Sequence, residues 1–214
     1  MLVKWLGHSS FVLKFANLTV VTDPYDGYVG YDMPEVSADV VTVSHHHADH
    51  DNVKAVSGSP IVLDKADLFE SAGVKISAIE TYHDKESGRL RGKTAVFKFQ
   101  GDDGVTVCHM GDVGGVFPDV ADFIRGADVL LIPVGGNYTV DAFDALSYVL
   151  ATRPAIVVPM HYKTEDCLFD IDKIDSFIEL FDTDHVHFLG ENNFEADKNL
   201  LTAYPDTQII VLKK

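Results

Sequence analysis

The segment Ser44–His50 crowds four histidines and an aspartate into one turn, directly after an apolar run that predicts a buried strand. Alternate residues leaving a strand point to the same side, so His45 and His47 can converge on one metal ion. The chain then bends, which aims Asp49 and His50 at a second ion. Imidazole and carboxylate without thiolate suit zinc, manganese or iron. A chain with this segment must therefore bring the end of that strand to an accessible edge of a sheet.

Two other origins of a histidine-rich segment fit this position less well. An expression tag lies at a terminus, whereas this segment is internal. A solvated loop is the other alternative, but four specified positions in the spacing His-x-His-x-Asp-His arise by chance with a probability of about one in a thousand in such a chain. We therefore interpret the segment as part of a metal site.

Three further candidate ligands, His83, Asp112 and His161, each follow a predicted strand. Taken alone, a histidine after a strand is more often a capping or core residue, and Gly111-Asp112 is an ordinary turn signal. Side chains at the ends of adjacent strands, however, form a common edge, where the active sites of layered α/β folds gather. The repeated placement favours one shared site.

Short strands dominate the first third of the chain, and helices alternate with strands later. The predicted strands are Val3–Leu6, Ser10–Phe15, Leu18–Thr22, Asp39–Ser44, Pro60–Leu63, Val74–Glu80, Thr94–Gln100, Val105–His109, Asp128–Pro133, Ala155–Met160, His185–Leu189 and Gln208–Leu212. The predicted helices are Lys65–Ser71, Pro118–Arg125, Asp141–Thr152 and Ile171–Phe181. Early hairpins and later alternation predict mixed sheets covered by helices, an α/β or α+β fold. No linker divides residues 1–214, which predicts a single domain.

The composition narrows the classes of partner. Seventeen basic and thirty-three acidic residues give a net charge of −16, which gives little support for nucleic acid or an anionic membrane as partner. A small anionic substrate stays compatible, because a bound divalent metal can invert the local field. Met1–Phe15 contains no signal-peptide core, and the apolar runs are too short to span a bilayer. Cys108 and Cys167 are expected to be reduced and buried, as in a cytoplasmic enzyme.

The candidate ligands occur in the order His45-x-His47-x-Asp49-His50, His83, Gly111-Asp112 and His161. This series resembles the metallo-β-lactamase-fold superfamily. Other strings resemble its branch of small hydrolases related to ascorbate-6-phosphate lactonase and N-acyl-phosphatidylethanolamine phospholipase D: Leu6-Gly-His-Ser-Ser-Phe11, Thr22-Asp-Pro24, Ile132-Pro-Val-Gly-Gly136 and Pro159-Met-His-Tyr162. The resemblance covers nearly the whole chain. It implies a four-layer αββα sandwich of two mixed sheets flanked by helices, with two metals at one edge.

The resemblance also implies a ligand set. A first metal would be held by His45, His47 and His83, a second by Asp49, His50 and His161, and Asp112 would bridge them. Asp23 matches a buried acidic residue that supports the metal loop. Only 33 positions separate His50 from His83, fewer than in many members, and His109 is the rival ligand. We prefer His83, because His109 lies within a strand-like run.

The activity that the resemblance implies is metal-dependent hydrolysis, in which a dinuclear metal-bound hydroxide cleaves a small ester, lactone or phosphodiester. Two zinc ions per chain are expected, with manganese and iron as alternatives. Asp49 would act as ligand and proton acceptor, and Asp112 as the bridge. Asn137 and Tyr138 would offer hydrogen-bond donors to a developing oxyanion, with packed turn residues as the equal alternative.

Several polar residues have no assigned role. His8, His46 and Lys163 would either meet a substrate anion or serve as surface and supporting residues. The one local basic cluster either steers an anion or forms a solvated loop; it consists of Arg89, Arg91 and Lys93.

Other functions stay open on the sequence. A nuclease of the same fold usually adds a clamping domain, for which 214 residues leave no room, and the charge is unfavourable. A redox diiron protein uses Glu where this chain has His47, and carries a flavin domain. A non-catalytic metal-binding or ligand-sensing module is the alternative from another class. The expected partner is a small molecule, with no nucleic acid and no stable membrane anchor, and homo-oligomerisation is left open.

Overall fold

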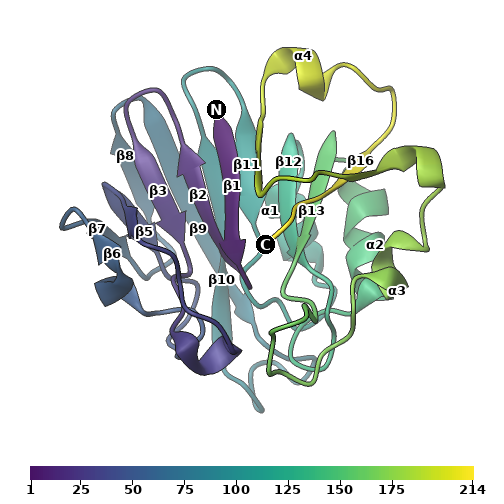
Figure 1. The fold of residues 1–214 in the computed structure, drawn as a ribbon, viewed down its shortest axis with the longest axis horizontal. Helices are drawn as coiled ribbons and strands as arrows, with labels where there is room; N and C mark the ends of the chain where they lie inside the picture. Colours follow the sequence, from purple (N-terminus) through teal and green to yellow (C-terminus); the bar gives the residue numbers. More distant parts are fainter.

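Two large β-sheets lie face to face in the computed structural model, which describes all residues 1–214 (Figure 1). The first sheet has the strand order β15 (Asn193–Glu195), β1 (Leu2–Gly7), β2 (Ser10–Lys14), β3 (Thr19–Thr22), β5 (Val40–Thr42), β7 (Ile61–Leu63). The second has the order β14 (Val186–Phe188), β16 (Gln208–Val211), β13 (Ile156–Met160), β12 (Val129–Pro133), β11 (Thr106–His109), β10 (Lys93–Gln100), β9 (Val74–Tyr82), β8 (Leu68–Ser71). Both sheets mix parallel and antiparallel pairs, which confirms the predicted sandwich.

Helices cover the second sheet on its outer face, whereas shorter segments cover the first. The helices of this layer are α1 (Pro118–Ile124), α2 (Ala142–Thr152) and α3 (Asp175–Ile178), and α4 (Lys198–Leu201) lies apart from them (Figure 1). On the first sheet, a two-stranded pair, β4 (Val36–Ser37) and β6 (Val56–Ser57), packs with the 3₁₀ helix Val53–Ala55 over an apolar cluster. The longest helix has 11 residues, and no helix could cross a membrane.

The main core fills the space between the sheets. Along β2, Phe11 and Leu13 belong to this core, whereas Val12 belongs to the cluster on the outer face. The first sheet is therefore covered on both sides. Strands β12 and β13 are buried at every position, and such strands produce the continuous apolar runs that made them predictable.

The directions of the strands create one functional edge. In the first sheet β1, β3 and β5 run the same way, because β2 is antiparallel to β1 and β3, and β5 is parallel to β3. In the second sheet β9, β11 and β13 likewise share a direction. The carboxyl ends of these strands lie at the lower edge in Figure 1. The polar residues that follow them are His8, Asp23, His45, His83, Asp112 and His161.

The predicted helix at Lys65–Ser71 is wrong. Leu68–Ser71 forms strand β8, which pairs antiparallel with β9. The connection is a two-residue turn, Ala72-Gly73, with positive φ at both positions (49° and 81°). Such a turn matches the twist of a hairpin, so pairing with β9 overrides the weak local helical preference.

The predicted helix at Ile171–Phe181 is much shorter than expected, since only Asp175–Ile178 forms helix α3. The beginning of the segment is drawn into the loops of the functional edge. The Asp172 N–H donates to the Gly135 carbonyl at 2.7 Å, and the Asp172 carbonyl accepts from the Lys163 N–H at 2.8 Å. These long-range bonds replace the first helical turn, while Phe177 still packs into the core.

Both cysteines are free and buried, as the sequence predicts. Burial raises the pKa of the Cys108 thiol to about 12, so this side chain is a neutral core residue at physiological pH. The structure also contains short elements that the sequence did not indicate, among them strands β4, β6 and β15 and helix α4.

Candidate metal centre

One group of three histidines gathers at the functional edge. Donor atoms of His45, His47 and His83 all lie within 4.8 Å of one another. The ring centroids of His45 are 4.4 Å from His47 and 4.7 Å from His83. His45 and His47 leave strand β5, and His83 leaves strand β9, so the two sheets contribute jointly. Three imidazoles at this separation can hold one metal ion.

A second group lies beside the first and contains four residues. Donor atoms of His8, Asp49, His50 and His161 lie within 4.8 Å of one another. Asp49 and His50 follow strand β5, as His45 and His47 do, and His161 follows β13. His8 was not expected in the set of ligands. The structure thus brings together the residues that the resemblance implied for a second metal, with one more imidazole beside them.

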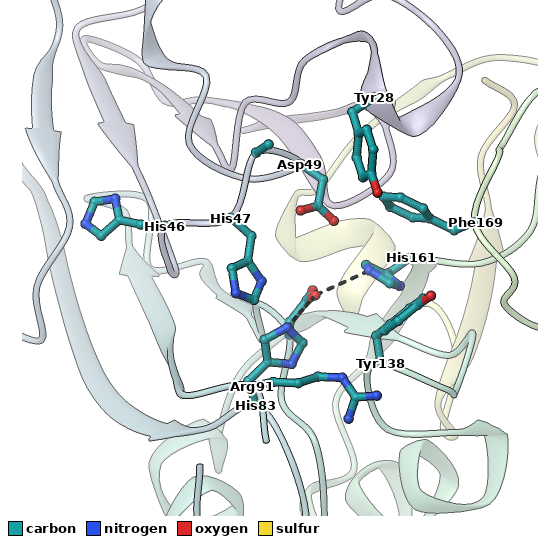
Figure 2. Close-up of a pocket in the computed structure, with 11 residues that line it drawn as sticks. Tyr28, His46, His47, Asp49, His83, Arg91, Tyr138, His161 and Phe169 are labelled. Atoms are coloured by element: carbon teal, nitrogen blue, oxygen red, sulfur yellow. Dashed lines mark ion pairs between the residues drawn. The ribbon is translucent and has the colours of Figure 1, made fainter. Parts of the chain in front are cut away.

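Asp112 lies between the two groups. Its Oδ2 atom is 3.4 Å from Nε2 of His83, 3.3 Å from Nε2 of His50 and 3.3 Å from Nε2 of His161. Figure 2 marks two of these contacts by dashed lines to the central carboxylate. Burial acts to raise the pKa of Asp112, but His161 and His50 hold it well below its usual range. The side chain is therefore a carboxylate within reach of both groups.

Buried polar atoms without a partner test whether metal ions fit here. The unpartnered atoms of the two groups are Nε2 of His45, Nε2 of His50, Nδ1 of His8, Nδ1 of His83, Nδ1 of His161 and Oδ1 of Asp112. Buried polar groups rarely stay unpaired, because each costs about 1–3 kcal/mol. Of these atoms, Nε2 of His45 and Nε2 of His50 lie 4.0 and 3.3 Å from Oδ2 of Asp112, so unpaired atoms of metal-ligating types fit a divalent cation at this edge.

The protonation states also suit a cation. Burial lowers the pKa of His45 to about 3 and that of His8 to about 4, which leaves both imidazoles neutral, the state that binds metals. Burial also acts to lower the pKa of His50, but Asp112 and Asp49 outweigh it and raise that pKa well above its usual value. The negative charges around His50 thus stabilise a positive charge at this point.

Asp23 supports both the first turn of the metal loop and His50. Its Oδ1 accepts the Ser44 N–H at 2.7 Å, and its Oδ2 accepts the Ser44 hydroxyl at 2.6 Å. The same Oδ2 lies 2.8 Å from Nδ1 of His50, which leaves Nε2 of that ring free to face Asp112. Burial acts to raise the pKa of Asp23, but the hydrogen bond from His50 lowers it below the usual value. This is the arrangement that orients a metal-ligating histidine.

We expect Asp23→Asn to weaken metal binding by about 10- to 100-fold with little change in fold. The amide oxygen can still accept from Ser44, but the amide NH₂ would face Nδ1 of His50 and favour the tautomer whose Nε2 carries hydrogen. Competition with a chromogenic chelator measures the affinity. An unchanged affinity would show that Asp23 does not orient His50.

His109 is a structural residue in this geometry. Its Nε2 lies 2.7 Å from the Ser9 carbonyl, and its Nδ1 accepts the Gly111 N–H at 3.2 Å. Both ring nitrogens are therefore used, and His109 belongs to neither group of metal-binding type. The geometry brings His83, rather than His109, to the other candidate ligands.

His8 is placed by the turn that joins β1 to β2. It has a positive φ of 51°, and its backbone N–H donates to the Tyr31 hydroxyl at 3.0 Å. Its side-chain Nε2 is 3.2 Å from Oδ2 of Asp49. In the sequence, the position of His8 just after a predicted strand was the one indication of its role. No local pattern indicated that this strand ends at the same edge as the strands that carry the other candidate ligands.

A pocket of about 500 Å³ opens beside the two groups. Figure 2 shows His47 and His83 on one side of it and an aromatic wall on the other, with His161 between two rings of that wall. The wall consists of Tyr28, Tyr138 and Phe169, with the ring of Phe169 5.5 Å from Tyr28 and 6.0 Å from Tyr138. Arg91 completes the lining on this side. The pocket can therefore hold a small molecule against the candidate metal ligands.

Three other polar residues that the sequence analysis considered lie outside the two groups of candidate ligands. Asn137 does not line this pocket, and its amide donates to the Asp170 carbonyl at 2.8 Å. Lys163 donates to the carbonyl of Phe169 at 2.5 Å and so supports the loop that carries this ring. His46 lies at the rim, with its side chain 66% exposed, and pairs with Asp51.

Comparison with known proteins agrees with this geometry. The family model described as a beta-lactamase superfamily domain matches residues 2–161. The chain is 30% identical to a UPF0173 metal-dependent hydrolase of Thermoplasma acidophilum, over 77% of this chain and 84% of that one. It is 31% identical to a UPF0173 metal-dependent hydrolase of Thermococcus kodakarensis, over 76% and 84%.

A solved structure shows the same fold over the whole chain. A Thermotoga maritima protein of the metallo-β-lactamase superfamily superimposes with a TM-score of 0.81 at 35% identity, over 99% of this chain and 97% of that one. The matches of family, sequence and fold agree with one another and with the metal-binding groups at the sheet edge. The chain therefore belongs to the metallo-β-lactamase superfamily, as a metal-dependent hydrolase.

Proposed function

We propose that this protein is a dinuclear hydrolase that cleaves a small ester, lactone or phosphodiester. The observation that carries the proposal is the pair of largely buried ligand groups on either side of Asp112, beside one pocket. One metal would be held by His45, His47 and His83 and the other by Asp49, His50 and His161, with Asp112 between them. Zinc is the proposed metal, and manganese and iron are the alternatives.

Bound metals would supply a Lewis acid that lowers the pKa of water and polarises a carbonyl or phosphoryl oxygen. The protein's own residues then have distinct tasks. Burial acts to raise the pKa of Asp49, but His50 lowers it far below the usual value, so Asp49 is a carboxylate that can hold a cation or accept a hydrogen bond at Oδ2. Tyr138 lines the pocket beside His161 and would donate its hydroxyl to the developing oxyanion (Figure 2).

A small molecule is the proposed partner, in a cytoplasmic setting. The charge of −16 disfavours nucleic acid, and the pocket of about 500 Å³ is of the size that takes a small ligand. Tyr28 and Phe169, which pack against each other beside His161, would shield the reacting bond from solvent.

The test combines metal analysis with a hydrolysis screen on untagged protein purified without chelator. We expect about two metal ions per chain by elemental analysis. We also expect hydrolysis of at least one class among p-nitrophenyl esters, dihydrocoumarin and bis(p-nitrophenyl) phosphate, lost on chelation and restored by zinc, manganese or iron. A protein without bound metal, even after reconstitution, would contradict the proposal and favour a non-catalytic module.

A further inference from the structure

The loop from Asp84 to Gly92 places one arginine at the pocket. This loop begins directly after His83, and it wraps around the buried carboxylate of Asp84. Oδ1 of Asp84 accepts the N–H groups of Glu86 and Gly88 at 2.7 and 2.9 Å. Oδ2 accepts the N–H groups of Leu90 and Arg91 at 2.9 and 2.8 Å. Four backbone bonds to one carboxylate give the loop a defined shape.

The loop is also tied to the candidate metal ligand at its start. The His83 N–H donates to the Gly92 carbonyl at 3.1 Å, and the Gly92 N–H donates to the Gly88 carbonyl at 2.9 Å. The backbone of Arg91 is therefore held in a constant position relative to His83. A binding group on such a support needs little ordering when a ligand arrives.

Arg91 is chemically unlike its basic neighbours. Arg89 pairs with Glu86, and Lys93 pairs with Glu80. No carboxylate lies within ion-pair distance of Arg91, and its side chain donates no hydrogen bond, although the chain contains thirty-three acidic residues. Its guanidinium is instead 5.4 Å from the ring centroid of Tyr138 (Figure 2). Arg91 is the only lysine or arginine that lines the pocket.

We propose that the guanidinium of Arg91 binds an oxyanion of the substrate, a carboxylate or a phosphate, in the pocket beside the metal ligands. An unpaired guanidinium presents a planar set of donors that matches both groups in bidentate fashion. The Tyr138 ring holds the side chain by a cation–π contact, and the aromatic wall accepts the apolar part of the ligand. This inference rests on the proposed hydrolase function for the identity of the pocket as a substrate site, and it narrows the substrate to one with an anionic group.

The test measures binding rather than turnover, with three probes of one shape. Phenylacetate and benzylphosphonate carry a carboxylate and a phosphonate, and phenylacetamide is their neutral counterpart. Titration calorimetry on metal-loaded protein compares the wild type with Arg91→Gln, Arg91→Lys and the matched control Arg89→Gln. We expect Arg91→Gln to weaken binding of at least one anion by about 10- to 100-fold, with Arg91→Lys in between. Phenylacetamide binding and the Arg89→Gln variant should be unchanged.

The outcomes separate this inference from the proposed function. The anion that loses more affinity in Arg91→Gln identifies the preferred oxyanion. Equal anion affinities in wild type and Arg91→Gln would mean that anions bind elsewhere, such as at the metals, and would overturn the role of Arg91. No binding by the wild type up to roughly 10 mM of either anion would also overturn it. Arg91-dependent binding in a protein without metal or hydrolysis would instead support the anion site and reject the hydrolase.

Discussion

Replacing Asp112 by Ala should abolish hydrolysis and halve the metal content or reduce it further. The Asp112 carboxylate lies within 3.4 Å of three imidazoles that belong to both ligand groups, so its loss removes the group that couples them. Metal assistance supplies several kcal/mol of transition-state stabilisation, which corresponds to a fall in kcat/KM of about 10³-fold or more. Elemental analysis and kinetics on the same preparation measure both effects.

The matched control is Asp122→Ala, an exposed aspartate on helix α1 that pairs with Arg125. We expect this variant to keep its metal and activity and to lose no more than about 0.5 kcal/mol of unfolding free energy. A circular dichroism spectrum of Asp112→Ala should match that of the wild type. Two metals retained in the Asp112 variant, together with undiminished hydrolysis, would remove this residue from the site.

Replacing Gly114 by Ala should destabilise the protein by about 3 kcal/mol and weaken metal binding as well. A Cβ atom at position 114 would lie 2.2 Å from the backbone nitrogen of Asp84 and 2.3 Å from the carbonyl carbon of His83. These neighbours are backbone atoms, which cannot rotate away. The chain must therefore move at His83, which presents a candidate metal-ligating imidazole. Urea unfolding of the metal-free and metal-loaded protein measures the two effects separately.

Gly190→Ala is the control for the loss of a glycine as such. A Cβ atom at Gly190 would meet nothing within 4 Å, and the residue has no positive φ. Its stability should stay within about 0.5 kcal/mol of the wild type. If Gly114→Ala were as stable as Gly190→Ala, the close approach of this turn to the His83 backbone would not hold in solution.

The local sequence pattern was sufficient to predict an element where the burial and hydrogen bonds of its residues depend on their immediate neighbours in the chain. The buried strands around Val129–Pro133 and Ile156–Met160 were predicted because both faces of these strands are covered, which requires continuous apolar runs. Helix α2 was predicted at Asp141–Thr152, and the Asp141 side chain indeed accepts the N–H groups of Phe143 and Asp144 as an N-cap.

Local patterns failed where long-range hydrogen bonds decide the conformation. Leu68–Ser71 becomes a strand because it can pair with β9, and Asp172 leaves the predicted helix because its backbone bonds to Gly135 and Lys163. Among the basic residues, Arg89 and Arg91 are two positions apart and equally charged. The fold of the loop around Asp84 alone decides that Arg89 pairs with Glu86 and that Arg91 lines the pocket.

The sequence by itself determined which chemical groups the site contains, because the histidines and aspartates follow strands in a recognisable order. The tertiary structure decided which of them meet. His8 joins Asp49 only because β1 runs in the same direction as β5, and His83 joins His45 only because the two sheets stack with their carboxyl edges together. The place of the Phe169 loop at the pocket likewise depends on contacts between distant segments. Strand direction and sheet stacking are contacts between distant segments, and no local spacing encodes them.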